Sequence, residues 1–300
     1  MIEIATEKEI AQLKDVWRSS FGDYDDYINL FMKNRLASSV PLVCKVDGKI
    51  VSVLYLLSGG VRFKNKVLSA EYVYAAATLP EYRGKGYMAE LLQEARKFSE
   101  AKGSDLICLV PASESLFSFY EKFGYTTVFK SRRIEIENIG FNQVSDTDFV
   151  FEIDRDFDTK QVLDCRNSVF NEEGTFIWDE NALKYAIDEC LFNDGYFAVC
   201  RKNGKICGYA LYYTDDHMIQ LAELCAEKAV KHFILSNIFL IHAADSAEAE
   251  FSTASDLVGL NAYSAGIINK GMALPISDEA HEFVELFGKT DEAWISLTLE

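Results

Sequence analysis

The alternation of apolar and polar residues predicts two helices at the start of the chain. Thr6 and Glu9 have the spacing of a capping box, and apolar residues recur at helical spacing from Ile10 to Trp17. A second helical pattern covers residues 23–36. We therefore expect the chain to begin with a pair of helices, the first of which starts near residue 7.

An antiparallel meander is expected after this pair. Residues 42–46 and 49–57 are rich enough in apolar and β-branched residues to be strands, and the Asp47-Gly48 dipeptide between them is a strong hairpin signal. Residues 61–67 then lead to an apolar and aromatic segment over residues 71–78. This order predicts strands that follow one another in sequence and pair with their neighbours.

The strand over residues 71–78 is followed by a glycine loop and a helix. The loop contains Arg83-Gly-Lys-Gly86, and residues 89–98 have the spacing of an amphipathic helix. Two glycines allow successive backbone N–H groups to point into one concavity at a helix N-terminus, which favours a phosphate group. The side chains of Arg83 and Lys85 add positive charge beside it.

Three interpretations of this loop compete. A nucleoside-triphosphate loop needs four residues between its glycines and then Gly-Lys-Ser/Thr, and a dinucleotide fingerprint needs three glycines. The residues from Arg83 to Met88 match neither pattern. On the loop alone, a surface turn that merely caps a helix stays as an alternative to a phosphate-binding loop.

A second motif follows, and together the two resemble the GNAT acyltransferase family. The segment from Arg83 to Met88 is similar to the family's Arg/Gln-x-x-Gly-x-Gly/Ala loop, with Met88 where Gly or Ala is usual. After an apolar strand over residues 105–110, the segment 113–125 is similar to the family's Asn-x-x-Ala-x-x-x-Tyr-x-x-x-Gly-Phe helix. Tyr120 and Gly124 match this helix, and Ser113 and Phe117 depart from it.

The resemblance implies that acetyl-CoA is the co-substrate and that its pyrophosphate rests on backbone amides of the loop. It also implies that the strand before the loop pairs with the pantetheine arm and turns an N–H group toward the thioester oxygen. The residues assigned to the co-substrate in this way are Ala76, Ala77, Thr78, Arg83, Gly84, Lys85, Gly86, Tyr87, Met88, Ala89 and Ser113.

Acyl transfer from a thioester to an amine needs a held donor, a polarised carbonyl, a neutral amine and a proton for the departing thiolate. Tyr120 is the candidate proton donor, because a phenol with a pKa of about 10 stays protonated at neutral pH. An aromatic residue packed in the core is the alternative. Glu71 is the candidate base, although Glu223 at the equivalent position of the second half indicates a structural reason for this glutamate.

The second half of the chain repeats part of the first. Residues 199–213 align without gaps on residues 43–57 and share Val, Cys, Gly, Lys and Ile, which indicates an internal repeat of domain length. Two unrelated hairpins are the alternative. Residues 226–235 then pass directly into a helical pattern without arginine or glycine. We therefore expect no phosphate-binding loop in the second copy.

The sequence predicts an α/β (α+β) fold with two tandem GNAT-like domains, each a mixed, mostly antiparallel sheet flanked by helices. A polar stretch places the boundary near residue 145, which gives domains of residues 1–145 and 146–300. Terminal strands of the first domain are expected over 126–129 and 132–136. Strands over 269–274 and 293–299 are expected to flank a helix from about residue 278. The arrangement is most similar to the Eis-like group without its C-terminal sterol-carrier-like domain.

Composition and net charge narrow the range of ligands, bound metals and compartments that we expect for this protein. The net charge of −17 disfavours nucleic-acid binding. The same charge favours a cationic acceptor such as an amine or polyamine, and a contribution to solubility alone is the alternative. Seven cysteines without a Cys-x-x-Cys motif indicate free thiols, and four scattered histidines indicate no metal site. Without a leader pattern or an apolar run of roughly 20 residues, a cytoplasmic protein that does not bind membranes is expected.

These observations predict an acetyl-CoA-dependent N-acyltransferase. The acetyl group would move to a primary amine of a small molecule or peptide by direct attack in a ternary complex. A non-catalytic acyl-CoA binding or regulatory module is the alternative, because it would keep the glycine loop without needing Tyr120. The sequence leaves the acceptor and the oligomeric state open.

Overall fold

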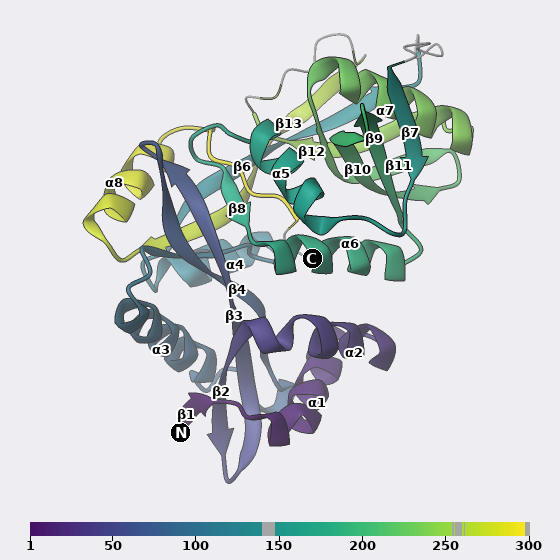
Figure 1. The fold of residues 1–300 in the computed structure, drawn as a ribbon. Coiled ribbons are helices and arrows are strands. Elements are labelled where there is room, and N and C mark those ends of the chain that lie inside the picture. The colour runs from purple at the N-terminus through teal and green to yellow at the C-terminus, as the bar shows by residue number, and fades with distance from the viewer. Residues whose placement is uncertain (140–147, 254, 256–259, 261, 298–300) are drawn as a thin grey trace. The chain divides into compact units, whose positions relative to one another are not determined.

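The computed structural model describes residues 1–139, 148–253, 255, 260 and 262–297, and this part of the chain divides into two compact units (Figure 1). The first unit comprises Met1–Val128 and Gly271–Lys289, and the second comprises Phe129–Lys270 and Thr290–Glu300. The boundary predicted near residue 145 lies outside the described residues. The two units are not two consecutive halves of the chain, because the C-terminal segment Gly271–Lys289 belongs to the first unit.

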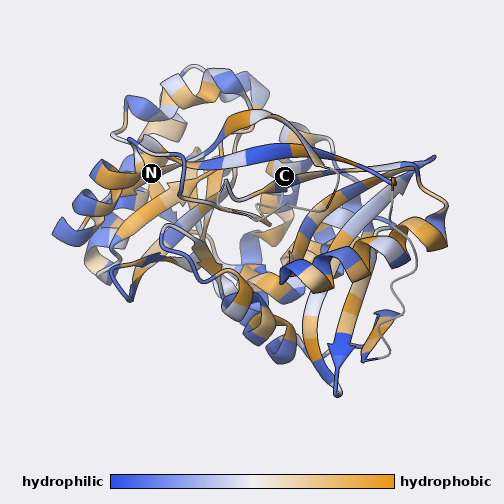
Figure 2. Ribbon diagram, turned by 90° about the horizontal axis from the view of Figure 1, so that it is seen from above, coloured by the Kyte–Doolittle hydropathy of each residue, from blue (hydrophilic) through white to orange (hydrophobic). Residues whose placement is uncertain are grey.

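The first unit is built on a sheet in the order β1-β2-β3-β4-β5-β13. The pairs are antiparallel except for the parallel pair of β4 and β5. Figure 2 shows hydrophobic residues along several strands and a mixture of hydrophobic and hydrophilic residues in the helices. The strands are β1 (Ile2–Ile4), β2 (Ser39–Val46), β3 (Lys49–Phe63), β4 (Lys66–Thr78), β5 (Leu106–Leu109) and β13 (Ala262–Pro275), of which only the end from Gly271 lies in this unit.

Helices cover both faces of this sheet, because neighbouring strand residues point to opposite sides. Tyr55 of β3 meets Phe31 with ring centroids 4.9 Å apart, whereas Leu54 joins a buried cluster with Leu91 on the other face. The predicted capping box of Thr6 and Glu9 is confirmed. The helices are α1 (Ile10–Phe21), α2 (Asp25–Asn34), α3 (Tyr87–Lys102), α4 (Glu114–Glu121) and α8 (Asp278–Phe287), with short 3-10 turns at Glu7–Glu9, Leu36–Ser38 and Pro80–Tyr82.

The predicted hairpin at Asp47-Gly48 is confirmed. Asp47 and Gly48 have φ values of 50° and 79°, and the equivalent residues of the second unit, Asn203 and Gly204, have 51° and 74°. Two consecutive left-handed residues form the tight turn that matches the twist of paired strands. The same local conformation at both positions agrees with the internal repeat.

The C-terminal segment completes the first unit. Met272–Pro275 of β13 pairs with Leu106–Leu109 of β5. Helix α8 then packs on the β3–β4 hairpin through Phe283, whose ring centroid lies 5.6 Å from that of Phe63. Lys66 adds an ion pair to Glu279 at 2.6 Å. Without this segment, β5 would have no partner on the side away from β4 and Phe63 would lose its aromatic neighbour.

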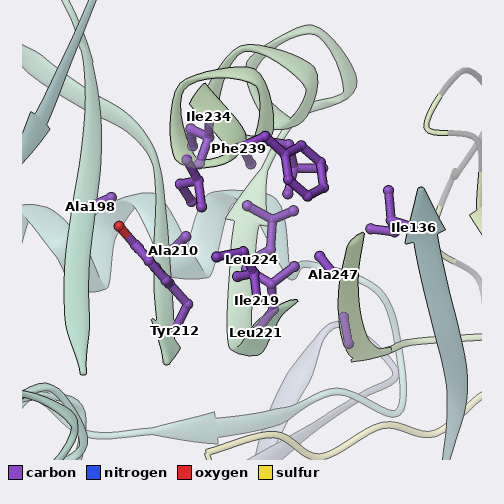
Figure 3. Close-up of a cluster of buried hydrophobic side chains, with 14 of the residues drawn as sticks. Ile136, Ala198, Ala210, Tyr212, Ile219, Leu221, Leu224, Ile234, Phe239 and Ala247 are labelled. Carbon is purple, nitrogen blue, oxygen red and sulfur yellow. The ribbon is translucent and has the colours of Figure 1, made fainter. Parts of the chain in front are cut away.

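The second unit has a sheet in the order β6-β12-β11-β10-β9-β7. Helix α7 packs on one face of it over a cluster that includes Ile219, Leu224 and Ile234 (Figure 3). Its elements are β6 (Thr126–Glu137), which begins in the first unit, β7 (Phe149–Ile153), α5 (Thr159–Val169), β8 (Phe176–Trp178), α6 (Glu180–Phe192), β9 (Tyr196–Lys202), β10 (Lys205–Asp215), β11 (Met218–Ala226), α7 (Lys228–His242), β12 (Ser246–Phe251) and the start of β13.

Two predictions about strands need correction. Residues 126–129 and 132–136 belong to the single strand β6. The strand predicted over 293–299 is wrong for its described part, since residues 293–297 contain only an isolated bridge from Trp294 to Thr175. Ala293, Trp294 and Ile295 are all buried, whereas a strand on a half-exposed sheet would alternate.

The seven cysteines are all free, and six of them are buried. This confirms the prediction of free thiols. None of the helices in the described part of the chain is long and apolar enough to span a membrane.

Candidate active site

The strand before the glycine loop contains a β-bulge. Val53 of β3 pairs with Ala77 of β4, but Tyr55 pairs with Tyr74, so Ala75 and Ala76 together face Leu54. Ala75 has a φ of 45°, a left-handed conformation that is uncommon outside glycine. A bulge bends its strand and changes the direction of the backbone groups that follow.

Strands β4 and β5 pair over only three residues. The parallel register covers Ala70–Tyr72 on β4 and Leu106–Cys108 on β5, although β4 continues to Thr78. Backbone groups of Ala76 to Thr78 that point away from β3 therefore lie beyond the ladder with β5. An open strand end of this kind offers hydrogen bonds to an extended ligand.

The glycine loop depends on backbone conformation. Gly84 and Gly86 have φ values of 75° and 89°, and Gly86 is the N-cap of α3. A Cβ atom added to either glycine would meet no atom within 4 Å. Glycine is therefore needed here because other residues rarely adopt these angles, and not because a neighbouring group lies too close. The loop leads directly into α3, so its N–H groups lie at a helix N-terminus, where anions bind.

Three cations surround the loop. Arg83 Nε donates a hydrogen bond of 3.0 Å to the carbonyl oxygen of Thr78. The ammonium groups of Lys85 and Lys49 lie 4.8 Å and 5.4 Å from the centroid of the Tyr82 ring. Lys49 also forms an ion pair of 3.2 Å with Glu81. Sequence reasoning missed Lys49, which the β2–β3 hairpin brings to the loop, and the only sequence signal was its place next to the turn.

The first turn of α3 contains the last three predicted loop residues. Tyr87 packs against Tyr82 with ring centroids 6.2 Å apart. Met88, which departs from the family pattern, is partly buried against the same apolar cluster as Ala76. Its side chain therefore has room in the core, and its backbone N–H lies in the first turn of the helix, where N–H groups have no intrahelical acceptor. Ala89 follows in the same turn.

Tyr120 comes from α4, and the fold brings it to the same cluster. The cluster contains Tyr120 and Tyr125 among its buried members and Ala76 among the partly buried residues packed against it. Burial raises the pKa of the Tyr120 hydroxyl, so the phenol stays protonated at neutral pH. Ser113, at the N-cap of α4, is exposed and lies 3.1 Å from the hydroxyl of Ser115.

Glu71 is held by two donors. Its Oε1 atom accepts hydrogen bonds from Lys102 Nζ at 2.6 Å and from Ser104 Oγ at 2.9 Å. Glu71 is buried, and Thr78 lies seven positions further along the chain, which corresponds to roughly 20 Å of extended strand. The structure therefore brings Tyr120 and Ala76 into one cluster but places Glu71 near the middle of β4, away from the strand end that leads into the loop.

The equivalent glutamate of the second unit is also bound to a cation. Glu223 pairs with Arg166 at 3.2 Å and accepts hydrogen bonds from Tyr209 and Ser296. All four residues are buried. Each copy of the repeat thus uses its glutamate in a buried polar network, which fits the structural reason inferred from the sequence.

The second unit has a different junction between strand and helix. From Glu223 to Ala226, β11 pairs with β10 in a continuous register, and its one shift lies before Glu223. Strand β11 ends at Ala226, Glu227 is the N-cap, and α7 starts at Lys228. The prediction that this copy enters its helix without a glycine loop is confirmed. Within the described residues, no cluster of potential metal ligands is present either.

Strand β4 thus carries a bulge, parts from its parallel neighbour β5 and ends in a glycine loop at the N-terminus of α3. The family model of the acetyltransferase (GNAT) domain matches residues 1–128, which is the continuous part of the first unit. Residues 1–128 are therefore a GNAT acetyltransferase domain. No curated protein sequence matches the chain.

Solved structures share the fold over nearly the whole chain. A probable N-acyltransferase from Enterococcus faecalis aligns with a TM-score of 0.78 and 19% identity, covering 95% of this chain and 74% of that one. Eis1 from Mycobacterium abscessus aligns with a TM-score of 0.70 and 12% identity, over 92% and 73% of the two chains. A tandem GNAT protein from the clavulanic acid biosynthesis pathway gives 0.54 and 10%, over 93% and 100%.

Proposed function

We propose that the protein transfers the acetyl group of acetyl-CoA to a primary amine of a small molecule or peptide. The observation that carries this proposal is the junction of β4 and α3, where the bulge at Ala75 and Ala76 precedes a left-handed glycine loop. The loop offers N–H groups to a pyrophosphate, and the open strand end offers hydrogen bonds to the pantetheine arm. The second unit, which lacks this junction, is proposed to support the first.

The reaction needs two proton transfers. The amine nitrogen attacks the thioester carbonyl carbon, the C–N bond forms, and the C–S bond breaks. Tyr120 gives its hydroxyl proton to the departing thiolate, and its raised pKa ensures that the proton is present at neutral pH. The proton released by the amine leaves to water or to a carboxylate.

Glu71 was the candidate for that carboxylate. Because its Oε1 atom is held by Lys102 and Ser104, and because Glu223 has comparable contacts, we propose a structural role for Glu71 and removal of the amine proton by water. A Glu71→Gln variant should then lose stability and keep its turnover per folded molecule. A variant that melts like wild type but turns over poorly would restore Glu71 as the base.

The acceptor is proposed to be cationic, in keeping with the net charge of −17. The test is a panel of aminoglycosides, polyamines, amino acids and peptides, assayed for release of free CoA and for the mass of the acetylated product. A product whose mass equals that of one of these amines with one hydrogen replaced by an acetyl group would support the proposal. Tight acetyl-CoA binding without turnover of any amine would instead indicate a binding or regulatory module.

A further inference from the structure

Ser52 is a buried hydroxyl in an otherwise apolar stretch of β3. Its side chain is 0% exposed. Its Oγ atom lies 2.9 Å from the carbonyl oxygen of Ala77 and 2.7 Å from the hydroxyl of Thr78. A carbonyl oxygen only accepts, so the one proton of Ser52 is given to Ala77, and the Thr78 hydroxyl must donate to Ser52. The direction of both hydrogen bonds is therefore fixed.

These bonds hold the end of β4 between the bulge and the loop. Ala77 and Thr78 directly follow the bulge, where the strand leaves the regular ladder. The carbonyl oxygen of Thr78 accepts a hydrogen bond from Arg83 in the loop. A hydrogen-bonded connection thus runs from Ser52 through the strand end to the glycine loop.

The peptide groups held in this way face the open side of β4. The N–H of Leu79 donates to the carbonyl oxygen of Val51 on β3, at 2.9 Å. Backbone groups alternate in direction along an antiparallel strand, so the N–H of Thr78 points away from β3. This is the side on which β5 has already parted from β4.

The internal repeat supplies a natural comparison. The gapless alignment places Gly208 of β10 at the position of Ser52. A Cβ atom at Gly208 would lie 2.7 Å from Ala226 Cβ and 2.7 Å from Val230 Cγ1. Glycine is needed there because the helix follows its strand closely, without a loop. The hydroxyl is therefore present in the copy that has the loop and absent in the copy that lacks it.

We propose that Ser52 is a positioning residue for acyl transfer. It holds the Ala77–Thr78 peptide so that strand-end N–H groups keep a fixed direction toward the thioester carbonyl of the donor. An N–H group with a fixed direction stabilises the negative charge that develops on the thioester oxygen, because it does not have to reorient during the reaction. This role rests on the proposed acetyl-CoA-dependent function.

The test uses acetyl-CoA labelled with 13C at the carbonyl carbon and bound to the full-length protein. Hydrogen bonding to the carbonyl oxygen moves the 13C resonance downfield, and this readout needs no acceptor. Ser52→Ala should lose most of the displacement that wild type shows while binding CoA within about twofold of the wild-type affinity. Once an acceptor is found, the kcat of Ser52→Ala with that acceptor should be about tenfold below that of wild type, with little change in KM for acetyl-CoA.

Ser99→Ala is the matched control. Ser99 is also a serine with 0% exposure, on α3, and its hydroxyl has no hydrogen-bond partner among the described residues. This variant should reproduce the wild-type resonance and kcat. Ser52→Thr keeps the hydroxyl and should restore both, and Ser52→Cys, with nearly the same volume and a weaker donor, replaces Ser52→Ala if that variant does not fold.

The outcomes separate this proposal from the proposed function. Wild-type protein that does not bind acetyl-CoA overturns both. Wild-type protein that displaces the carbonyl resonance, together with a Ser52→Ala variant that displaces it equally, overturns the role of Ser52 alone. Loss of the displacement in both Ser52→Ala and Ser99→Ala also overturns it, because a general loss of packing would then be the cause.

Discussion

The rings of Tyr120 and Tyr125 meet edge to face with their centroids 5.8 Å apart. Both hydroxyls have a pKa raised by burial. The Tyr125 hydroxyl is fully buried and has no hydrogen-bond partner among the described residues. This combination of full burial and a missing partner does not apply to the Tyr120 hydroxyl. Two neighbouring tyrosines therefore differ in the environment of their hydroxyl groups.

Replacement of Tyr120 by phenylalanine should separate catalysis from packing. The variant keeps the ring and removes the proton, so turnover should fall about 100-fold while the acetyl-CoA affinity and the melting temperature hardly change. Tyr125→Phe is the matched control and should stay active, because its buried hydroxyl bonds to none of the residues that the structure describes. A stable and fully active Tyr120→Phe variant would exclude Tyr120 as the acid.

Gly86→Ala should weaken acetyl-CoA binding, because a left-handed φ of 89° costs other residues about 1 kcal/mol or more and the loop would relax to a different conformation. Gly103→Ala is the control. Gly103 has a φ of 79° at the C-cap of the same helix and, like Gly86, no atom within 4 Å of an added Cβ. Calorimetric titration and thermal melting should show similar destabilisation in both variants and weaker binding in Gly86→Ala alone. Equal acetyl-CoA affinity in the two variants would remove the loop from the site.

Residues 1–145 alone should not form a stable domain. Such a fragment lacks Met272–Pro275, which pairs with β5, and Phe283, which packs against Phe63. We expect thermal melting of this fragment to be broad and non-cooperative. Residues 1–128 joined to 271–289 through a flexible linker should melt cooperatively, because this protein would contain the whole first unit. A sharp transition in the shorter fragment would show that the C-terminal segment is dispensable.

Stability between pH 4.5 and pH 2 should depend on Glu9. The hydrogen bond from Lys45, followed by that from the Thr6 backbone, lowers the pKa of the Glu9 carboxyl from 4.5 to about 2. A carboxyl whose pKa is lower in the folded state stabilises the fold above the unfolded pKa, and this contribution is lost as the pH falls through the folded one. The free energy of unfolding of Glu9→Gln should therefore fall less than that of wild type over this pH range. Denaturant unfolding at each pH measures this difference.

Glu7→Gln is the control for this pH dependence. Glu7 lies in the same 3-10 turn, but its side chain makes none of the hydrogen bonds of Glu9. The Glu7→Gln variant should therefore lose as much stability as wild type when the pH is lowered from 4.5 to 2. The same flattening in both variants would attribute the effect to net charge and not to the pair of Glu9 and Lys45.

The sequence by itself determined the elements and much of the glycine loop. Helical periodicity, the capping box of Thr6, the Asp47-Gly48 turn and the left-handed glycines are local features, and each was visible in a few consecutive residues. The two family motifs placed Tyr120 and the loop correctly on α4 and at the start of α3. Local interactions are sufficient to form these elements, because each of them involves residues that are near neighbours in the chain.

Only the tertiary structure decided which strands meet and where the ladder is broken. The bulge at Ala75 and Ala76 has no signal in a run of alanines, because it arises from the register of β4 against β3. The contact of Lys49 with Tyr82 and the pairing of β13 with β5 likewise join segments that are distant in the sequence. Such pairings depend on which long-range contacts bury the most surface across the whole fold, and the periodicity of a single segment carries no information about its partner.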